Sequence, residues 1–421
     1  MSKPSNRAYF LLAFLTFLNI LNFIDRQLIS SMAPLLIKDL NLTNAQIGLL
    51  SGYVFLFFYT VMGLVLGTVA DRTHRPRLIA AGLTIWSALT AISGMARGFL
   101  SLASARMLVG VGEATLSPAA LSMLSDVFPP LQRAFATGIY YAGVPLGAGL
   151  SLLVSGWMAP RFGWRTSFYV LGGLGLVMVV LVLFLADPRR GAMEKKQSDI
   201  PHPPQSTLGI LGDLFVGLQT APALLLTVLG GITLTFSAAA GNHLVTWLVK
   251  ERGFAFSNAA YIGGILFATG GLLGNVFGGW FADWCQRRYS GGRLWSMVIQ
   301  GVIFPPIGIA FFSFPPDSPL FYVAWFLTSF GSSCWYGPLY AVTQDLAAIH
   351  IRSTMIAFMT LAVSCVGTGA GPWVAGMIGD SHSLSLGLKV CAFMPLLGTI
   401  PFALAARRFE ADKQRVAEYA R

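Results

Sequence analysis

Two stretches of the sequence, Gly67-Thr-Val-Ala-Asp71-Arg-Thr-His-Arg75 and Gly279-Trp-Phe-Ala-Asp283-Trp-Cys-Gln-Arg287, share the pattern GxxADxxxR. They lie 212 residues apart, which is about half of a chain of 421 residues. Each follows a long, mostly apolar segment. A charged motif that repeats at half-chain distance suggests that the chain consists of two similar halves.

A second pair of charges repeats in the same way. Asp126 and Arg133 are seven residues apart, and Asp345 and Arg352 match them at an offset of 219 residues. Both pairs lie in short connections between apolar segments. Two independent features at this offset make chance similarity a poor explanation, and we predict two six-helix halves in parallel repeat.

The composition indicates an integral membrane protein. Hydrophobic residues make up 55% of the chain and charged residues 11%, whereas soluble domains carry about 25% charged residues. A membrane-spanning helix needs about 20 mostly apolar residues. Twelve segments meet this length, at residues 8–36, 46–70, 77–97, 101–126, 133–158, 166–186, 221–249, 256–283, 294–314, 319–346, 353–378 and 385–406. The expected fold is all-α, with twelve transmembrane helices in two pseudo-symmetric bundles.

The segment from Asp187 to Thr207 separates the two bundles. Its prolines and charges forbid a membrane span, so we expect a solvent-exposed linker. Residues 208–219 are predicted to form a short amphipathic helix along the membrane interface. The expected domains are therefore 1–187, a linker region 188–220, and 221–421. In the second half, Gly337-Pro338 marks an expected break in the span 319–346.

Basic residues predict the orientation in the membrane. Of the 28 lysines and arginines, 19 lie in the tails and alternate connections that we assign to the cytoplasm, seven on the opposite side and two within spans. Because such residues concentrate on the cytoplasmic side, we expect both termini inside the cell and the chain in the cell membrane. The same location explains the net charge of +11 without a nucleic-acid partner.

Three motifs make the sequence similar to the major facilitator superfamily over nearly its whole length. Gly67–Arg75 resembles the superfamily's loop between helices 2 and 3. The group Arg106, Gly110, Gly112 and Glu113 resembles its helix 4 motif, and residues 143–149 (GVPLGAG) resemble its glycine-proline motif on helix 5. The resemblance implies a central cavity lined by helices 1, 4, 7 and 10.

Within the superfamily, residues 22–26 (NFIDR) and 106–117 (RMLVGVGEATLS) resemble the Spinster branch. That resemblance implies transport of lysophospholipids and sphingoid phosphates. Bacterial organic-anion carriers share the Asp-Arg pair of the first helix, so a second interpretation stays open: a proton-coupled carrier of small organic anions or drugs. A membrane enzyme or receptor is disfavoured, because no catalytic group, metal cluster or phosphate loop occupies one plausible site.

Four charged residues fall well inside the predicted spans: Asp25, Arg26, Arg106 and Glu113. A charge at the centre of a bilayer costs at least about 2.5 kcal/mol, so such residues are functional candidates. Arg106 and Glu113 are two helical turns apart and share a face. Asn22 and Arg26 lie on one polar stripe of the first helix.

These residues suggest roles in transport. Glu113 is the expected proton carrier, and Arg26 is the expected ligand of an anionic headgroup that pairs with Glu113 when substrate is absent. Asp25 is either a second proton site or the group that holds Arg26, and Asn22 and Arg106 complete the predicted binding site. The alternative is a fixed network that only holds helices 1 and 4 together.

The charged connections suggest a cytoplasmic gate. The resemblance implies that Asp71 caps helix 11 and that Arg75 pairs with Asp126 when the cytoplasmic side is closed. The mirror set is Asp283, Arg287, Asp345 and Arg352. The alternative is that these charges only set the orientation in the membrane.

The second half contributes uncharged candidates. Trp335, Tyr336 and Tyr340 are aromatic residues for a substrate's apolar part, or else packing residues, and His243 is either a proton site or a structural residue. A charged half facing an aromatic half suits an amphiphile. The expected function is thus proton-coupled transport of anionic lipids by a monomer, whose partners are substrate, protons and bilayer, with no cofactor, metal or enzymatic activity.

Overall fold

The computed structural model describes residues 5–70, 72–190, 207–347 and 351–419, and every regular element in these ranges is a helix. The chain divides into two compact units. The first comprises Met1–Asp199 and Leu248–Ala268, and the second comprises Ile200–Trp247 and Thr269–Arg421. The helical fold agrees with the predicted class.

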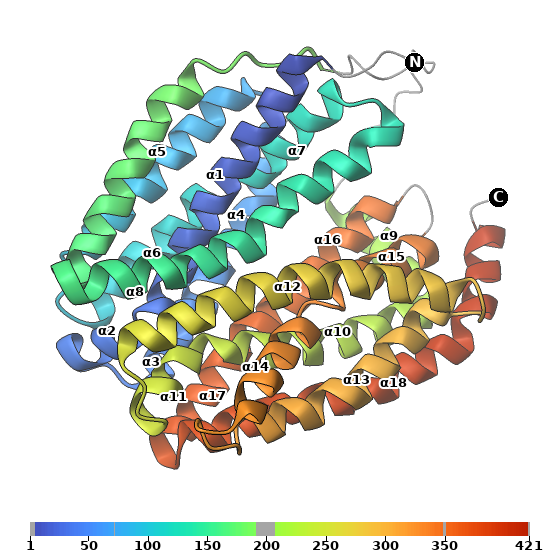
Figure 1. The fold of residues 1–421 in the computed structure, drawn as a ribbon. Coiled ribbons are helices and arrows are strands. Elements are labelled where there is room, and N and C mark those ends of the chain that lie inside the picture. Colours follow the sequence, from blue (N-terminus) through green and yellow to red (C-terminus); the bar gives the residue numbers. More distant parts are fainter. Residues whose placement is uncertain (1–4, 71, 191–206, 348–350, 420–421) are drawn as a thin grey trace. The chain divides into compact units, whose positions relative to one another are not determined.

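The first unit contains the first eight helices (Figure 1). They are α1 (Asn6–Ser31), α2 (Ala33–Leu40), α3 (Asn44–Ser51), α4 (Tyr53–Ala70), α5 (Arg75–Ser93), α6 (Phe99–Glu113), α7 (Leu116–Val127) and α8 (Pro130–Leu183). Helix α8 packs against both α1 and α5. A buried apolar core that includes Leu15, Leu18 and Met123 holds the unit together.

Helix α8 contains two of the predicted spans in one element of 54 residues. The two parts meet at Gly163, whose φ of 81° and ψ of 158° are not helical. Only glycine adopts positive φ without steric cost. The predicted connection between residues 158 and 166 is therefore a sharp break at one glycine.

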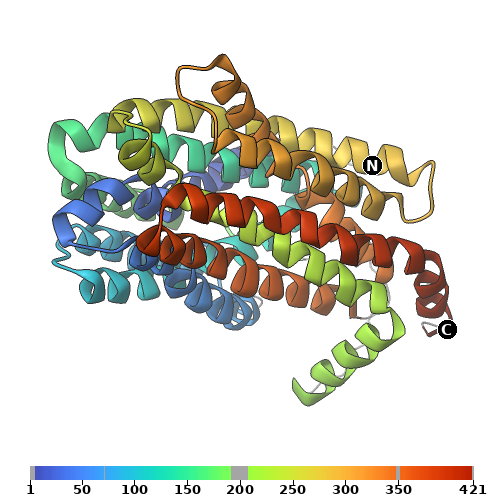
Figure 2. The same cartoon turned by 90° about the horizontal axis from the view of Figure 1, so that it is seen from below.

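The remaining elements belong wholly or partly to the second unit. They are α9 (Thr207–Thr220), α10 (Pro222–Ala240), the 3-10 turn η1 (Gly241–His243), α11 (Leu244–Glu251), α12 (Phe256–Gln286), α13 (Gly292–Phe311), α14 (Pro319–Gly331), α15 (Tyr336–Leu346), α16 (Arg352–Ala362), the π-helical η3 (Val363–Thr368), α17 (Gly369–Ser381) and α18 (Leu384–Tyr419). Part of α11 and the first half of α12 belong to the first unit. Figure 2 shows α10 (yellow-green) and α18 (red) side by side, in agreement with their extensive packing.

Ten stretches of the described chain are long and apolar enough to cross a membrane. One of them, Phe135–Leu183, contains two predicted spans. The predicted span 319–346 is missing from the ten because it is divided between α14 and α15. The ten stretches are therefore consistent with twelve crossings. The predicted amphipathic segment is helical, as α9.

Candidate functional site

Three of the four charged candidates of the first unit are nearly inaccessible, and the fourth, Arg26, is partly buried. Asp25 and Arg26 lie near the end of α1, Arg106 lies on α6, and Glu113 is the last residue of α6. The exposed fractions of Asp25, Arg106 and Glu113 are 5%, 1% and 1%. Two acids and two bases thus share one buried region, where each charge needs a partner.

Arg26 and Glu113 form the central pair of this region. The Nε and Nη2 atoms of Arg26 donate hydrogen bonds to Oε2 of Glu113, at 3.2 and 3.0 Å. The side chain of Arg26 is 19% exposed, whereas that of Glu113 is 0% exposed. The cation of this pair is therefore partly exposed, whereas its carboxylate is not exposed.

Aromatic rings surround the Arg26 guanidinium. Its Cζ atom lies 4.6, 4.8 and 4.3 Å from the ring centroids of Phe23, Phe55 and Tyr59. These contacts stabilise a cation through the negative faces of the rings. Gly110 of α6 allows this arrangement, because an added Cβ would lie 2.8 Å from the backbone oxygen of Phe55 on α4.

Asp25 and Arg26 turn toward different helices. Oδ2 of Asp25 accepts a hydrogen bond of 2.6 Å from the hydroxyl of Thr90 on α5. Arg106 donates from Nη2 to the backbone oxygen of Arg26 at 3.2 Å, and its guanidinium lies over the Phe55 ring. The divergence follows from the turn of about 100° between neighbouring residues of a helix.

The asparagines of α1 complete this face. Asn22 is 3% exposed and lies one turn before Arg26. Asn19 donates from Nδ2 to the backbone oxygen of Tyr140 at 2.8 Å, which ties α1 to α8. We name Asn22, Asp25, Arg26, Arg106 and Glu113 the buried charge cluster.

The candidates of the second unit have structural contacts. Nε2 of His243 lies 2.7 Å from the backbone oxygen of Pro372, and since a carbonyl only accepts, the imidazole is the donor. Trp335 belongs to the hydrophobic core of the second unit. Its ring stacks on that of Tyr336 with 3.8 Å between the ring centroids, and Tyr336 is 42% exposed. The Tyr340 hydroxyl accepts from Thr360 at 3.3 Å.

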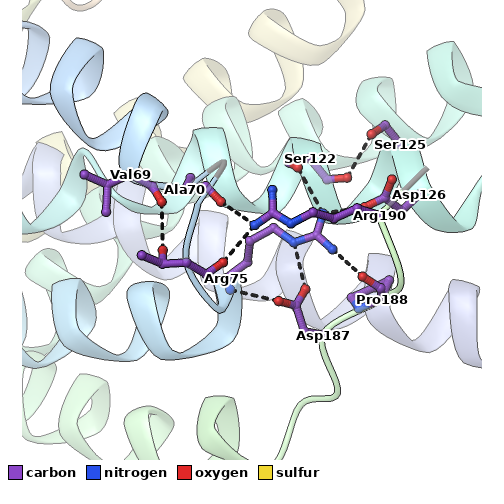
Figure 3. A network of polar contacts seen from close by, with 10 residues as sticks. Val69, Ala70, Arg75, Ser122, Ser125, Asp126, Asp187, Pro188 and Arg190 are labelled. Carbon is purple, nitrogen blue, oxygen red and sulfur yellow. Dashed lines mark hydrogen bonds and ion pairs between the residues drawn. The ribbon is translucent and has the colours of Figure 1, made fainter. Parts of the chain in front are cut away.

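A second group of charges surrounds Arg75 in the first unit (Figure 3). Arg75 is 0% exposed and forms ion pairs with Asp126 and with Oδ1 of Asp187, the latter at 2.7 Å. It also donates to Ser122 Oγ at 3.0 Å and to the backbone oxygen of Pro188. The predicted contact between Arg75 and Asp126 is therefore present. We name these five residues the Arg75 cluster.

The start of the predicted linker makes contacts in this region, although Arg189 and Arg190 are exposed as expected. Asp187 accepts the Arg75 backbone N–H at 3.1 Å in addition to the side-chain bond. Arg190 donates to the backbone oxygens of Ala70 and Thr73, at 2.7 and 2.8 Å. Because Ala70 ends α4, the cation lies where the helix dipole favours it. Residues 187–190 thus attach the end of α8 to the α4–α5 connection.

In the second unit a different arginine occupies the equivalent place. Arg293, the second residue of α13, bonds Asp283 Oδ1 at 2.8 Å and Asp345 Oδ2 at 2.5 Å. The predicted mirror set pairs Asp345 with Arg287, whereas in this structure Asp345 pairs with Arg293, and Arg287 is exposed and ends the sequence motif before the next helix begins. Asp71 and the side chain of Arg352 lie outside the described residues.

Several partners were missed by reasoning from the sequence. Asp187 follows the last apolar residues of α8 and was grouped with the linker. The sequence distance could have identified Arg293 as the counterpart of Arg75. It lies 218 residues after Arg75, close to the offset of 219 that relates Asp126 and Asp345. Thr90 and the rings around Arg26 carry no such signal. Within the described ranges, no group of three His, Cys, Asp or Glu residues could hold a metal ion.

Buried charges on membrane-length helices, with matching ion-pair clusters in two units, define the class of multi-pass membrane transporters. The family model of the Major Facilitator Superfamily matches residues 15–372. The chain belongs to this superfamily, and Spinster proteins are among the relatives it resembles. Its function is transport rather than enzymatic catalysis.

The relatives differ in what their names describe. The chain is 30% identical to an MFS-type efflux pump of Mycolicibacterium smegmatis, over 96% of this chain and 94% of that protein. It is 28% identical to human protein spinster homolog 1 (97% and 82%) and 28% identical to the hexuronate transporter of Bacillus subtilis (94% and 93%). The crystal structure of a bacterial homolog to the human lysosomal transporter Spinster matches with a TM-score of 0.82 at 23% identity, covering 98% of this chain and 99% of that one.

Proposed function

We propose that this chain is a proton-coupled secondary transporter of anionic amphiphilic lipids, of the lysophospholipid or sphingosine phosphate class, and works by alternating access. The observation that carries the proposal is the pair of a partly exposed Arg26 and a wholly buried Glu113. A cation that an anion can reach, held by an acid that can take up a proton, is sufficient to couple the two ligands.

The coupling follows from competition for Arg26. While Glu113 is ionised, it holds the Arg26 guanidinium through two hydrogen bonds. A proton on Glu113 removes this charge and releases Arg26 for the headgroup. Proton binding therefore favours anion binding, and by linkage anion binding favours protonation to the same degree.

The surroundings of Arg26 support an amphiphile. Three rings lie within 5 Å of its Cζ atom, so an anion bound there sits beside apolar surface. A phosphate joined to a hydrocarbon chain offers both kinds of contact. The motif resemblance to the Spinster branch implies the same class of substrate, and human protein spinster homolog 1 is 28% identical to this chain.

A second candidate is transport of small organic anions. The hexuronate transporter of Bacillus subtilis is 28% identical to this chain, and a hexuronate carries a carboxylate that a guanidinium can bind through paired hydrogen bonds. In this case Arg26 binds the carboxylate and the aromatic rings only support the arginine.

The other predicted roles remain parts of the proposal. Asp25 assists protonation, Asn22 and Arg106 complete the headgroup site, and His243, Trp335, Tyr336 and Tyr340 serve the substrate from the second unit. The Arg75 cluster with Asp71, and the set of Asp283, Arg293, Asp345 and Arg352, form the cytoplasmic gate. We further propose a monomer in the cell membrane with both termini inside.

Transport by purified protein in proteoliposomes tests the proposal. Labelled lysophospholipid, sphingosine phosphate and hexuronate are compared in two modes: accumulation driven by a pH gradient, and exchange without a gradient. We expect Glu113→Gln to lose driven accumulation by about tenfold or more, within the usual range of coupling energies, and to keep exchange. Glu418→Gln, which changes an exposed acid at the end of α18, is the control.

The outcomes separate the candidates. Lipid flux that follows the gradient and disappears in Arg26→Ala supports the lipid transporter. Flux of hexuronate without lipid flux supports the second candidate, a transporter of small organic anions. Full gradient-driven accumulation by Glu113→Gln contradicts the coupling mechanism.

A further inference from the structure

A small cavity lies between α1, α5 and α8 of the first unit, on the side of Asp25 that faces Thr90. Its volume is about 20 Å³. Three polar side chains line it, Asp25, Ser87 and Thr90, and the rest of the lining includes the apolar side chains of Leu83 and Trp86. The cavity is thus polar at one place and apolar elsewhere.

Two of the residues that line this cavity each have a polar atom without a hydrogen-bond partner among the described residues: Oδ1 of Asp25 and Oγ of Ser87. Asp25 is 5% exposed and Ser87 is 1% exposed. Leaving a buried polar group without a partner costs about 1–3 kcal/mol, and more for a charged group. Two lining residues of one cavity that each carry such an atom indicate a bound polar ligand.

The size and chemistry of the cavity select that ligand. A cavity needs roughly 10–15 Å³ and two to four polar partners to hold a water molecule. We infer that one water molecule binds here. An ionised carboxylate only accepts, so the water donates to Asp25 Oδ1, accepts from the Ser87 hydroxyl, and donates its second proton to Thr90 Oγ1.

The water site gives Asp25 a hydrogen-bond partner outside the Arg26–Glu113 pair. The cations that act on Asp25 are Arg106 of α6 and Arg26 of its own helix, and Glu113 is the nearby acid. Neither α5 nor α8 adds a titratable side chain to the cavity lining. With Thr90 and the water as partners, Asp25 does not require Arg26. This consequence rests on the proposed function, because it leaves Arg26 available to Glu113 or to the substrate.

Hydroxyl-radical labelling by synchrotron X-rays tests the site in the full-length protein in detergent. Radicals formed from a bound water label adjacent side chains even when bulk solvent cannot reach them. Trp86 is 3% exposed and lines the cavity, whereas Trp247 is 0% exposed and lies elsewhere. We expect labelling of Trp86 well above that of Trp247.

Two variants are designed to remove the water site, and a third variant is their matched control. Ser87→Ala deletes one of three water ligands, and Gly175→Ala places a methyl group against Ser87. We expect each to reduce Trp86 labelling by about fivefold, because a buried water needs at least two or three partners. Ser155→Ala removes another buried serine hydroxyl that has no partner in the described chain and does not line the cavity, so labelling should persist.

The result is independent of transport. Labelling needs neither substrate nor a pH gradient, so Glu113→Gln should keep it even though driven flux is lost. Wild-type labelling of Trp86 at the level of Trp247, or unchanged labelling in Ser87→Ala, overturns the water site and leaves the proposed function untouched.

Discussion

Replacing Arg75 by alanine should destabilise the protein more than replacing its neighbour Arg77. The Arg75 side chain is fully buried and is the shared cation of Asp126 and Asp187. It also bonds Ser122 Oγ and the backbone oxygen of Pro188. Arg77 lies on the same helix, two residues further on, and is exposed.

The magnitude follows from what the substitution leaves behind. The carboxylates of Asp126 and Asp187 are only 10% and 18% exposed, so water cannot fully replace the lost cation. Removing one partner of a buried ion pair costs about 3–5 kcal/mol. In a domain of this size each kcal/mol lowers Tm by about 2–4 °C, so we expect a loss of about 10 °C. An exposed substitution such as Arg77→Ala usually changes stability by less than about 0.5 kcal/mol.

The assay is thermal unfolding of the purified protein in detergent, at one fixed scan rate because the unfolding of such proteins is commonly irreversible. Asp187→Asn should lower the apparent Tm by less than Arg75→Ala, since Arg75 keeps Asp126. The double variant should lose less than the sum of the two, because both residues belong to one network. Equal apparent Tm values for Arg75→Ala and Arg77→Ala would refute the reasoning.

Two further predictions concern ion pairs elsewhere. Arg293→Ala should lower the apparent Tm by a few degrees, roughly 1–2 kcal/mol, because its partners Asp283 and Asp345 are more exposed than those of Arg75; Arg287→Ala is the control, and an equal loss would argue against the pairing. Hydrogen bonding from Arg165 lowers the pKa of Asp39, which lies in α2 outside the membrane-length stretches. A carboxyl whose pKa is lower in the folded state contributes stability above its unfolded pKa of about 3.9 and loses that contribution as the pH falls through the folded pKa. Asp39→Asn should therefore lose less apparent Tm than wild type between about pH 6 and pH 3, and parallel losses would contradict this.

Composition and apolar segment length were enough to predict the helical membrane fold, because a bilayer leaves few other ways to satisfy the backbone. The structure differs from the prediction in the residues at which one of the helices ends. Gly337-Pro338 was the expected break in the tenth span, but α14 ends at Gly331 and α15 begins at Tyr336. Proline is tolerated in the first turn of a helix, where its missing N–H needs no partner. The break therefore lies just before Pro338.

The charged residues of the candidate site could be predicted one by one, since each is costly inside a bilayer. Their partners could be predicted only in part. The pairing of Arg26 with Glu113 follows from opposite charge on helices that the family resemblance places together. The bond from Thr90 to Asp25 and the rings of Phe55 and Tyr59 around Arg26 depend on how α4 and α5 are rotated, and threonine and aromatic residues are common on any membrane helix.

The pairing of Asp345 with Arg293 shows which kind of symmetry the two halves preserve. The motif places an arginine four residues after each aspartate, at Arg75 and at Arg287. In the structure Asp126 is bound by Arg75, the first residue of α5, and its counterpart Asp345 is bound by Arg293, the second residue of α13. Helix α12 continues to Gln286, three residues beyond Asp283, and α13 begins only at Gly292. The position in the motif and the position at the helix start therefore coincide in the first half and separate in the second. A guanidinium at the start of a packed helix is held in place by that helix, whereas one in a loop loses more conformational freedom when it binds. The position relative to the helix, rather than the position in the motif, is therefore the feature that identifies the partner of Asp283 and Asp345.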